Sequence, residues 1–92
     1  MTYIDDAKYK LGGREFSHLI ADTSEELYTM MDKLKIDRQY LANQGKWNEH
    51  VLVCNCCKRN AAILRGVTRI TEPVAMAKLL ARKYGALQDS RN

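Results

Sequence analysis

Short β-branched or aromatic runs alternate along this chain with segments whose apolar residues repeat at helical spacing. The runs at residues 3–6, 16–21, 51–53 and 67–70 are predicted to be strands. Helices are predicted around residues 23–34, 55–64 and 71–85, with a short helical turn at 37–41. Strands that alternate with helices indicate an α/β domain. We therefore expect a four-stranded sheet, mixed or mostly parallel, with three main helices.

The ends of the predicted helices carry recognisable signals. Thr23 and Glu26 have the spacing of a capping box, in which each side chain accepts a hydrogen bond from the other residue's backbone. Asn55 is suited to cap the second helix, and Gly66 stands where a left-handed C-terminal cap belongs. Pro73 lies in the first turn of the last helix, where its missing N–H has no cost. The first helix also has one apolar stripe, formed by Leu27, Met30, Met31 and Leu34.

A chain of 92 residues is long enough for one domain, which we expect to span residues 1–85, followed by a flexible tail at 86–92. So small a core is marginally stable, which favours a homo-oligomer. No apolar run reaches the roughly 18 residues that cross a bilayer, and the first residues lack the pattern of a secretory signal. The chain has three cysteines, whereas small secreted domains held by disulfides usually have an even number. We expect a cytoplasmic protein without membrane contact.

All three cysteines and one of the two histidines lie in the stretch HVLVCNCCKR, residues 50–59. His50 and Cys54 would be about 13 Å apart along a regular strand, too far to share a zinc ion. Cys54 and Cys57 form a C-x-x-C at a predicted helix start, but the remaining features of a thioredoxin-type sequence are missing. We predict that Cys56 and Cys57 are small buried residues under the first helical turn, and we expect no metal or cofactor.

The same turn offers a second interpretation, as an anion site. A helix N-terminus has unpaired N–H groups and a partial positive charge. Lys58 and Arg59 add formal charge just after it, although a solvated basic pair on a helix face would look the same. The net charge of +4 also favours an anionic partner, but the excess is spread along the chain, which does not favour nucleic acid.

Three carboxylates, on Asp5, Asp6 and Asp22, each follow a predicted strand. If those strands run parallel, the carboxylates meet at one edge, where they could hold Mg²⁺ for phosphoester cleavage with His18 and His50 as acid–base groups. The simpler interpretation is that Asp5 and Asp6 only end a strand, and that Asp22 stabilises the helix that follows it through the helix dipole. His18 would then be an ordinary buried histidine. Trp47, the only tryptophan, precedes the third strand and could stack on a nucleobase.

These residues carry a family resemblance. The stretch YIDD at residues 3–6 and the stretch HLIADT at residues 18–23 resemble the domain of unknown function 4031 family, short proteins of bacteria and their phages. The resemblance covers roughly residues 2 to 72 and includes His50, the Lys58-Arg59 pair and Gly66. Members tend to have a tyrosine and an acid after the histidine, where Val51 and Leu52 stand here. The resemblance implies a fold and no activity.

We expect the protein to bind an anionic, nucleotide-like small molecule without catalysing a reaction. In the phage setting that the resemblance implies, the ligand would be a host immune signalling nucleotide that the protein sequesters in the host cytoplasm. One alternative is a metal-dependent phosphodiesterase or nuclease, and another is an inhibitor that binds a host protein. The expected ligand-binding residues are Asp5, Asp6, His18, Asp22, Trp47, His50, Lys58 and Arg59.

Overall fold

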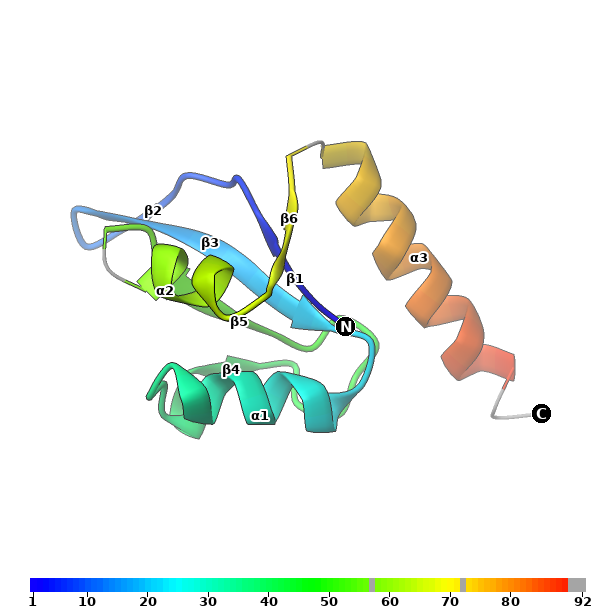
Figure 1. Cartoon of the computed structure of the whole chain (residues 1–92). Helices are drawn as coiled ribbons and strands as arrows, with labels where there is room; N and C mark the ends of the chain where they lie inside the picture. The colour runs from blue at the N-terminus through cyan, green and yellow to red at the C-terminus, as the bar shows by residue number, and fades with distance from the viewer. Residues whose placement is uncertain (57, 72, 90–92) are drawn as a thin grey trace.

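The computed structural model describes residues 1–56, 58–71 and 73–89, which form one mixed sheet with helices on both faces (Figure 1). The strand order is β4-β5-β3-β1-β6, and β2 pairs with β3 beside this path. The strands are β1 (Thr2–Asp5), β2 (Tyr9–Leu11), β3 (Arg14–Ala21), β4 (Leu41–Ala42), β5 (His50–Cys54) and β6 (Thr68–Ile70). The helices are α1 (Ser24–Lys33), the 3₁₀ helix η1 (Arg38–Tyr40), α2 (Lys58–Leu64) and α3 (Pro73–Asp89).

The α/β class and the mixed sheet confirm the prediction from sequence. The sheet has two more strands than predicted, because β2 and β4 are too short to show a periodic pattern. Strand β1 runs parallel to β6 and antiparallel to β3. Strands β2 and β5 are both antiparallel to β3, and β4 is antiparallel to β5. In the described residues, no helix has the length and apolar character that crossing a bilayer requires.

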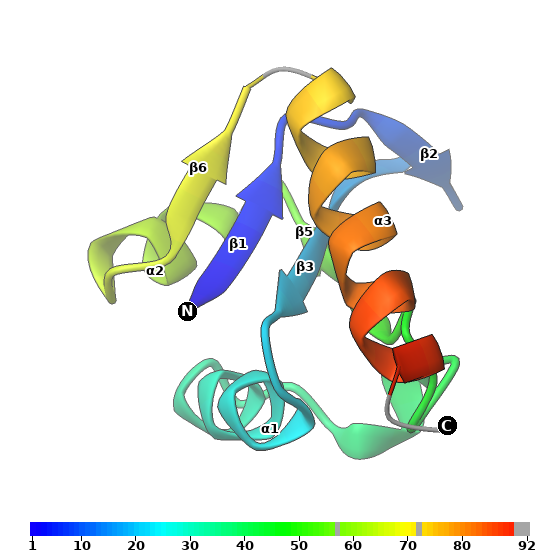
Figure 2. The ribbon, with the colours of Figure 1, turned by 90° about the vertical axis from the view of Figure 1, so that its right-hand side faces the viewer.

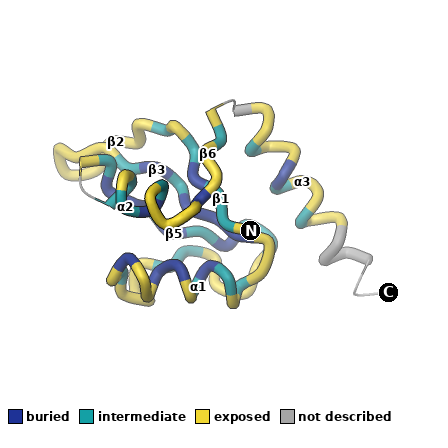
Figure 3. The backbone as a smooth tube through the Cα atoms, viewed as in Figure 1, coloured by how far each residue is buried: buried dark blue, intermediate teal, exposed yellow. Residues whose placement is uncertain are grey.

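Alternation along the strands divides the sheet into two faces. One face packs against α1 and α2 and forms the core, seen as dark blue segments in Figure 3. Helix α3 lies over the opposite face, across β1 and β3 (Figure 2). Core side chains include Ile4, Leu19 and Val51 from the sheet and Leu27 and Met31 from α1, each at most 1% exposed.

The first helix forms as predicted. Glu26 donates its backbone N–H to Oγ1 of Thr23, and the Thr23 hydroxyl donates to the Glu26 carboxylate. The apolar stripe predicted for this helix is buried, at Leu27, Met30, Met31 and Leu34. Propensity, cap and amphipathic pattern all favour the same helix, which is why the sequence predicted it well.

The other helix ends differ in part from the prediction. Asn55 was predicted to cap α2, but the helix begins at Lys58 and the Asn55 side chain bonds elsewhere. Gly66 has the predicted left-handed conformation, with φ 92°, and turns the chain from α2 into β6. Helix α3 was predicted to end at Gly85 before a flexible tail, yet it continues to Asp89. Residues 90–92 of the predicted tail lie outside the described residues.

The core makes one direct test of this fold possible. Leu19 is fully buried between α1 and the sheet, whereas Leu64 at the end of α2 is 86% exposed. We expect Leu19→Ala to lower the free energy of unfolding by about 2–5 kcal/mol, because it removes apolar contacts and leaves a cavity. Leu64→Ala, the same chemical change at the surface, should stay within about 0.5 kcal/mol of the unaltered protein. Urea unfolding followed by circular dichroism measures both values. Equal losses would contradict the described core.

Candidate functional site

A pocket of about 330 Å³ lies between the sheet and α3. Residues of β1, β3 and β5 form its floor, the loop before β5 forms one side, and α3 covers it. It is lined by Asp5, His18, Ile20, Trp47, Asn48, His50, Met76 and Leu80. A larger hollow of about 450 Å³, between α1 and the start of β1, includes none of the predicted site residues in its lining.

The strand pattern explains which side chains reach the pocket. On β3, Leu19 and Ala21 belong to the core, so His18 and Ile20 point to the opposite face. On β5, Val51 and Val53 belong to the core, so His50 points to the pocket face as well. On β1, Ile4 belongs to the core, so Asp5 points to the pocket face. Alternation along three strands therefore brings Asp5, His18 and His50 together on a largely apolar surface.

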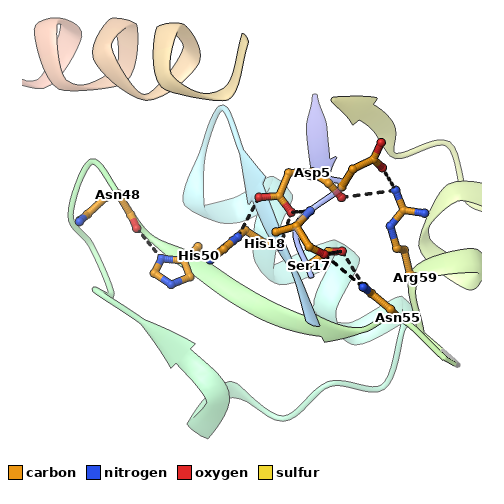
Figure 4. Close-up of polar contacts among 9 residues, drawn as sticks. Asp5, Ser17, His18, Asn48, His50, Asn55 and Arg59 are labelled. Atoms are coloured by element: carbon orange, nitrogen blue, oxygen red, sulfur yellow. Dashed lines mark hydrogen bonds and ion pairs between the residues drawn. The ribbon is translucent and has the colours of Figure 1, made fainter. Parts of the chain in front are cut away.

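Asp5 holds His18 through two hydrogen bonds across the β1–β3 pair. The backbone N–H of His18 donates to Oδ1 of Asp5 and the ring Nδ1 lies against Oδ2, each at 2.8 Å (Figure 4). The backbone N–H of Ala7 also donates to this carboxylate. An ionised carboxylate only accepts, so Nδ1 of His18 carries the proton of this contact. The other ring nitrogen, Nε2, is therefore the one that a ligand can meet.

This contact shifts the pKa values of both groups in opposite directions. The hydrogen bond to Asp5 raises the pKa of His18, although burial acts to lower it. Burial acts to raise the pKa of Asp5, but the hydrogen bonds from His18 and Ala7 outweigh it, and the pKa lies below its ordinary value. The pair therefore favours a negative Asp5 beside a positive His18.

His50 is oriented in a similar way by a backbone group. Its Nδ1 lies 2.8 Å from the carbonyl oxygen of Asn48, which can only accept, so Nδ1 donates. The His18 and His50 rings meet in a T-shaped arrangement with centroids 5.6 Å apart, and both line the pocket. The ring of Tyr9 of β2 also lies near His18, with a centroid distance of 6.4 Å. The site thus contains two imidazoles, each anchored through Nδ1.

Asn48 contributes a further polar atom. Its side-chain oxygen, Oδ1, is buried and has no hydrogen-bond partner among the described residues. Buried acceptors are almost always paired in folded proteins, so this unpaired oxygen of a pocket-lining residue is an exception. No pattern in the sequence indicated this asparagine, because the burial of its oxygen depends on the tertiary structure.

Glu49 holds the loop that carries Trp47 and Asn48. Its carboxylate is buried, 3% exposed, and accepts hydrogen bonds from the hydroxyls of Ser24 and Tyr28 and from the backbone of Gly45. Burial acts to raise the pKa of Glu49, but these donors outweigh it and the pKa is lowered. Glu49 therefore anchors the loop to α1. Sequence analysis missed it, since an acid beside Asn48 and His50 carries no pattern that predicts burial.

Trp47 connects this loop to α3. Its ring meets the Tyr84 ring in a T-shaped contact, with centroids 5.2 Å apart. Lys83, on the same helix, donates to the backbone carbonyl of Ala21 at the end of β3. Burial lowers the pKa of Lys83, although the charges of Glu49 and Asp22 oppose the shift. These contacts hold α3 over the pocket.

The structure separates the remaining predicted site residues from the pocket lining. Because β1 and β3 are antiparallel, Asp22 lies beside Met1 at the opposite end of β1 from Asp5, and the predicted convergence of carboxylates is wrong. Asp6 pairs with Arg59, which also donates to the Asp5 carbonyl oxygen. Lys58 donates to the carbonyl of Leu34 at the end of α1, away from Arg59's contacts.

The cysteine region also differs from the prediction. Cys56 was predicted to be buried but is exposed, whereas Cys54 at the end of β5 is buried. Their sulfur atoms are 2.9 Å apart. Cys57, the third cysteine, lies outside the described residues, so the predicted burial of its side chain is not addressed. No group of three histidine, cysteine or acidic side chains in residues 1–56, 58–71 and 73–89 is placed to hold a metal ion.

A comparison with models of protein families identifies the family to which the chain belongs. The model of the family DUF4031, described as a protein of unknown function, matches residues 2–83. The chain therefore belongs to this family, as its sequence resemblance predicted. No curated protein and no solved structure matches the chain.

The Asp5–His18 pair predicts a defined pH dependence. The charged and titratable groups that face His18 are Asp5, Tyr9 and His50, and Asp5 is the one that raises its pKa. In NMR titrations we expect the pKa of His18 to lie above its ordinary value of about 6.5, and Asp5→Asn to lower it. Asp32→Asn, an exposed acid paired with Arg38, is the control and should leave it unchanged.

The same pair should contribute to stability in one pH window. Because the pKa of His18 is raised in the folded protein, His18 contributes its full stabilisation of the fold below about pH 6.5. This contribution is lost as pH rises through the raised pKa. Because the pKa of Asp5 is lowered in the folded protein, Asp5 contributes its full stabilisation of the fold above about pH 4. This contribution is lost as pH falls through the lowered pKa. The free energy of unfolding of Asp5→Asn should therefore differ most from that of the unaltered protein between about pH 4 and 6.5. A constant difference from pH 4 to 9 would contradict the pairing.

Removing the buried carboxylate should weaken the loop. Glu49→Ala leaves the donors on Ser24, Tyr28 and Gly45 without their acceptor, and we expect a loss of roughly 1–3 kcal/mol in urea unfolding. Glu15→Ala, at an exposed position of β3, is the matched control and should change the value by less than about 0.5 kcal/mol. If Glu49→Ala were as stable as Glu15→Ala, the loop would not depend on this carboxylate.

Proposed function

We propose that the pocket between the sheet and α3 binds a small, anionic, nucleotide-like molecule. The observation that carries the proposal is that an aromatic residue, Trp47, lines the same pocket as the Asp5–His18 pair. A nucleotide combines a planar base with an anionic phosphate, and this pocket combines a surface suited to each. The expectation from sequence, based on Trp47, His18 and His50, thus has a geometric basis.

The apolar part of the pocket suits a base. Ile20 of β3 and Met76 and Leu80 of α3 line it together with Trp47. Small-molecule sites are typically apolar with a few polar groups that fix orientation. Asn48 also lines the pocket, and a side-chain amide is a group that can hydrogen-bond the edge of a base. The volume of about 330 Å³ is near the lower end of the range for ligand sites, roughly 300–1,000 Å³, which favours one nucleoside unit.

The polar part suits the anionic group. His18 holds its Nδ1 proton against Asp5, and its raised pKa favours the imidazolium form, whose Nε2–H can donate to a phosphate oxygen. Asp5 offsets part of that positive charge, so the attraction is moderate and depends on pH. Arg59 takes no direct part, because it is occupied by Asp6 and the Asp5 carbonyl.

The wider setting remains a prediction. A cytoplasmic phage protein that sequesters a host immune nucleotide would need tight binding and no turnover, and the family resemblance is the only support for this setting. A homo-oligomer is likewise expected from size alone. Tyr9 and Leu11 of the β2 strand are large, apolar and about half exposed, which is compatible with a contact to a second copy.

The alternative functions gain less support. A phosphodiesterase that binds metal through Asp5, Asp6 and Asp22 lacks its geometry, because Asp22 lies at the other end of β1. An inhibitor that binds a host protein has no specific observation in its favour. Nucleotide binding is therefore the function that we carry forward.

The single tryptophan provides a direct test of binding. Trp47 lines the pocket, so a bound base should change its fluorescence. We expect ribonucleoside monophosphates to quench this fluorescence saturably, and more strongly at pH 6 than at pH 8, since protonated His18 binds the phosphate better. Uncharged nucleosides should bind more weakly and with less dependence on pH. Cyclic dinucleotides, tested in the same way, address the predicted immune signal.

A matched pair of acids is the control. Asp5→Asn should weaken nucleotide binding several-fold at pH 6, because it removes the group that favours protonated His18. Asp22→Asn makes the same change outside the pocket and should leave the affinity unchanged. Absence of saturable quenching by any nucleotide, or equal effects of the two variants, would overturn the proposal.

A further inference from the structure

We infer that His18 and His50 act as an acid–base pair that cleaves a ribonucleotide phosphodiester through attack by its own 2′-hydroxyl. This inference rests on the proposed nucleotide binding and adds a reaction to it. It departs from the expectation of binding without catalysis, which came from sequence alone. The observation that carries it is the placement of two separately oriented imidazoles in one pocket.

The two imidazoles are oriented for proton transfer in the same way. Nδ1 of His18 is held by the Asp5 carboxylate and Nδ1 of His50 by the Asn48 carbonyl, both at 2.8 Å (Figure 4). In each ring the second nitrogen, Nε2, is left for a substrate, and no described residue forms a hydrogen bond with it. General acid–base catalysis requires such positioned groups within reach of one reacting centre. The ring centroids are 5.6 Å apart and both rings line the pocket, so we expect a single phosphate to meet both imidazoles.

Their partners assign different roles to the two rings. His18 has a carboxylate behind it, which stabilises its protonated form and suits a general acid. His50 has only a neutral carbonyl behind it, and in its neutral form Nε2 has a lone pair that can accept a proton. A pair of groups whose environments differ in this way is typical of acid–base sites.

The reaction balances without a metal or a redox partner. Nε2 of His50 removes the proton of the 2′-hydroxyl as O2′ bonds to phosphorus. The bond from phosphorus to O5′ breaks, and O5′ takes the proton from Nε2 of His18. The products are a 2′,3′-cyclic phosphate and a 5′-hydroxyl, with one proton gained by His50 and one lost by His18. Proton exchange with water restores both rings.

The pocket favours a nucleophile that the substrate supplies. None of the described residues that line it has a hydroxyl or thiol, and its only carboxylate, on Asp5, is engaged by His18 and Ala7. The base on one side of the phosphate can lie against Trp47 inside the pocket. The second nucleoside can lie over Tyr9, which is 51% exposed beside His18.

The test uses uridylyl-adenosine, a ribodinucleotide, in buffer with EDTA. We expect cleavage to a 2′,3′-cyclic uridine phosphate and adenosine, detected by liquid chromatography with mass spectrometry. The rate should follow a bell-shaped pH profile, since it needs one protonated and one neutral imidazole. His18→Gln and His50→Gln should each lower the rate about 100-fold or more. Asp32→Asn, an exposed acid that pairs with Arg38 and does not line the pocket, should retain the full rate.

The outcomes distinguish the reaction from binding. The dinucleotide with a 2′-deoxyribose in place of the first ribose should quench Trp47 fluorescence but stay intact. If the ribodinucleotide quenches Trp47 and remains uncleaved, the acid–base inference is wrong and the proposed binding stands. If no nucleotide quenches, both are wrong. Cleavage that persists in the folded double variant of His18 and His50 would also overturn the inference, because it would come from another nuclease. Circular dichroism confirms that each variant is folded.

Discussion

The antiparallel pairing of β1 with β3 is the constraint on which the site depends. It places Asp5 opposite the backbone of His18, where one carboxylate accepts from both the N–H and the ring of that residue. The pairing therefore stabilises the sheet and orients the imidazole through the same side chain. The same pairing places Asp22 beside Met1, at the opposite end of β1 from Asp5. His18 and Asp22 of the HLIADT stretch therefore lie at different ends of the sheet.

A second carboxylate, the buried one of Glu49, connects the pocket to the rest of the fold. Glu49 accepts hydrogen bonds from α1 and from its own loop, and it precedes His50 on β5. Through Trp47 and Tyr84 the loop also meets α3. Two acids, the partly buried Asp5 and the buried Glu49, thus hold the floor and the side of one pocket. Removing either would leave its donors without their acceptor, which is most costly at the buried Glu49.

The pocket forms because the two faces of the sheet are covered to different extents. The face against α1 and α2 is filled by aliphatic side chains from both layers. In the part of the chain that the structure describes, one helix, α3, covers the other face, which contains His18 and His50 where the first face has Leu19 and Val51. A single helix cannot cover a whole sheet face, so a hollow remains beside it. The polar side chains of that face therefore stay accessible to a small molecule.

Local interactions determined what the sequence by itself could predict. The α1 cap and stripe, the turn at Gly66 and the α/β class follow from neighbours a few residues apart. Four of the expected ligand-binding residues, Asp5, His18, Trp47 and His50, line one pocket. Strand direction, the burial of Glu49 and of the Asn48 side-chain oxygen, and the placement of Met76 and Leu80 in the pocket lining were decided only by the tertiary structure. Strand pairing joins residues far apart in the chain, and burial depends on what packs over a residue, so neither leaves a periodic signal in the sequence.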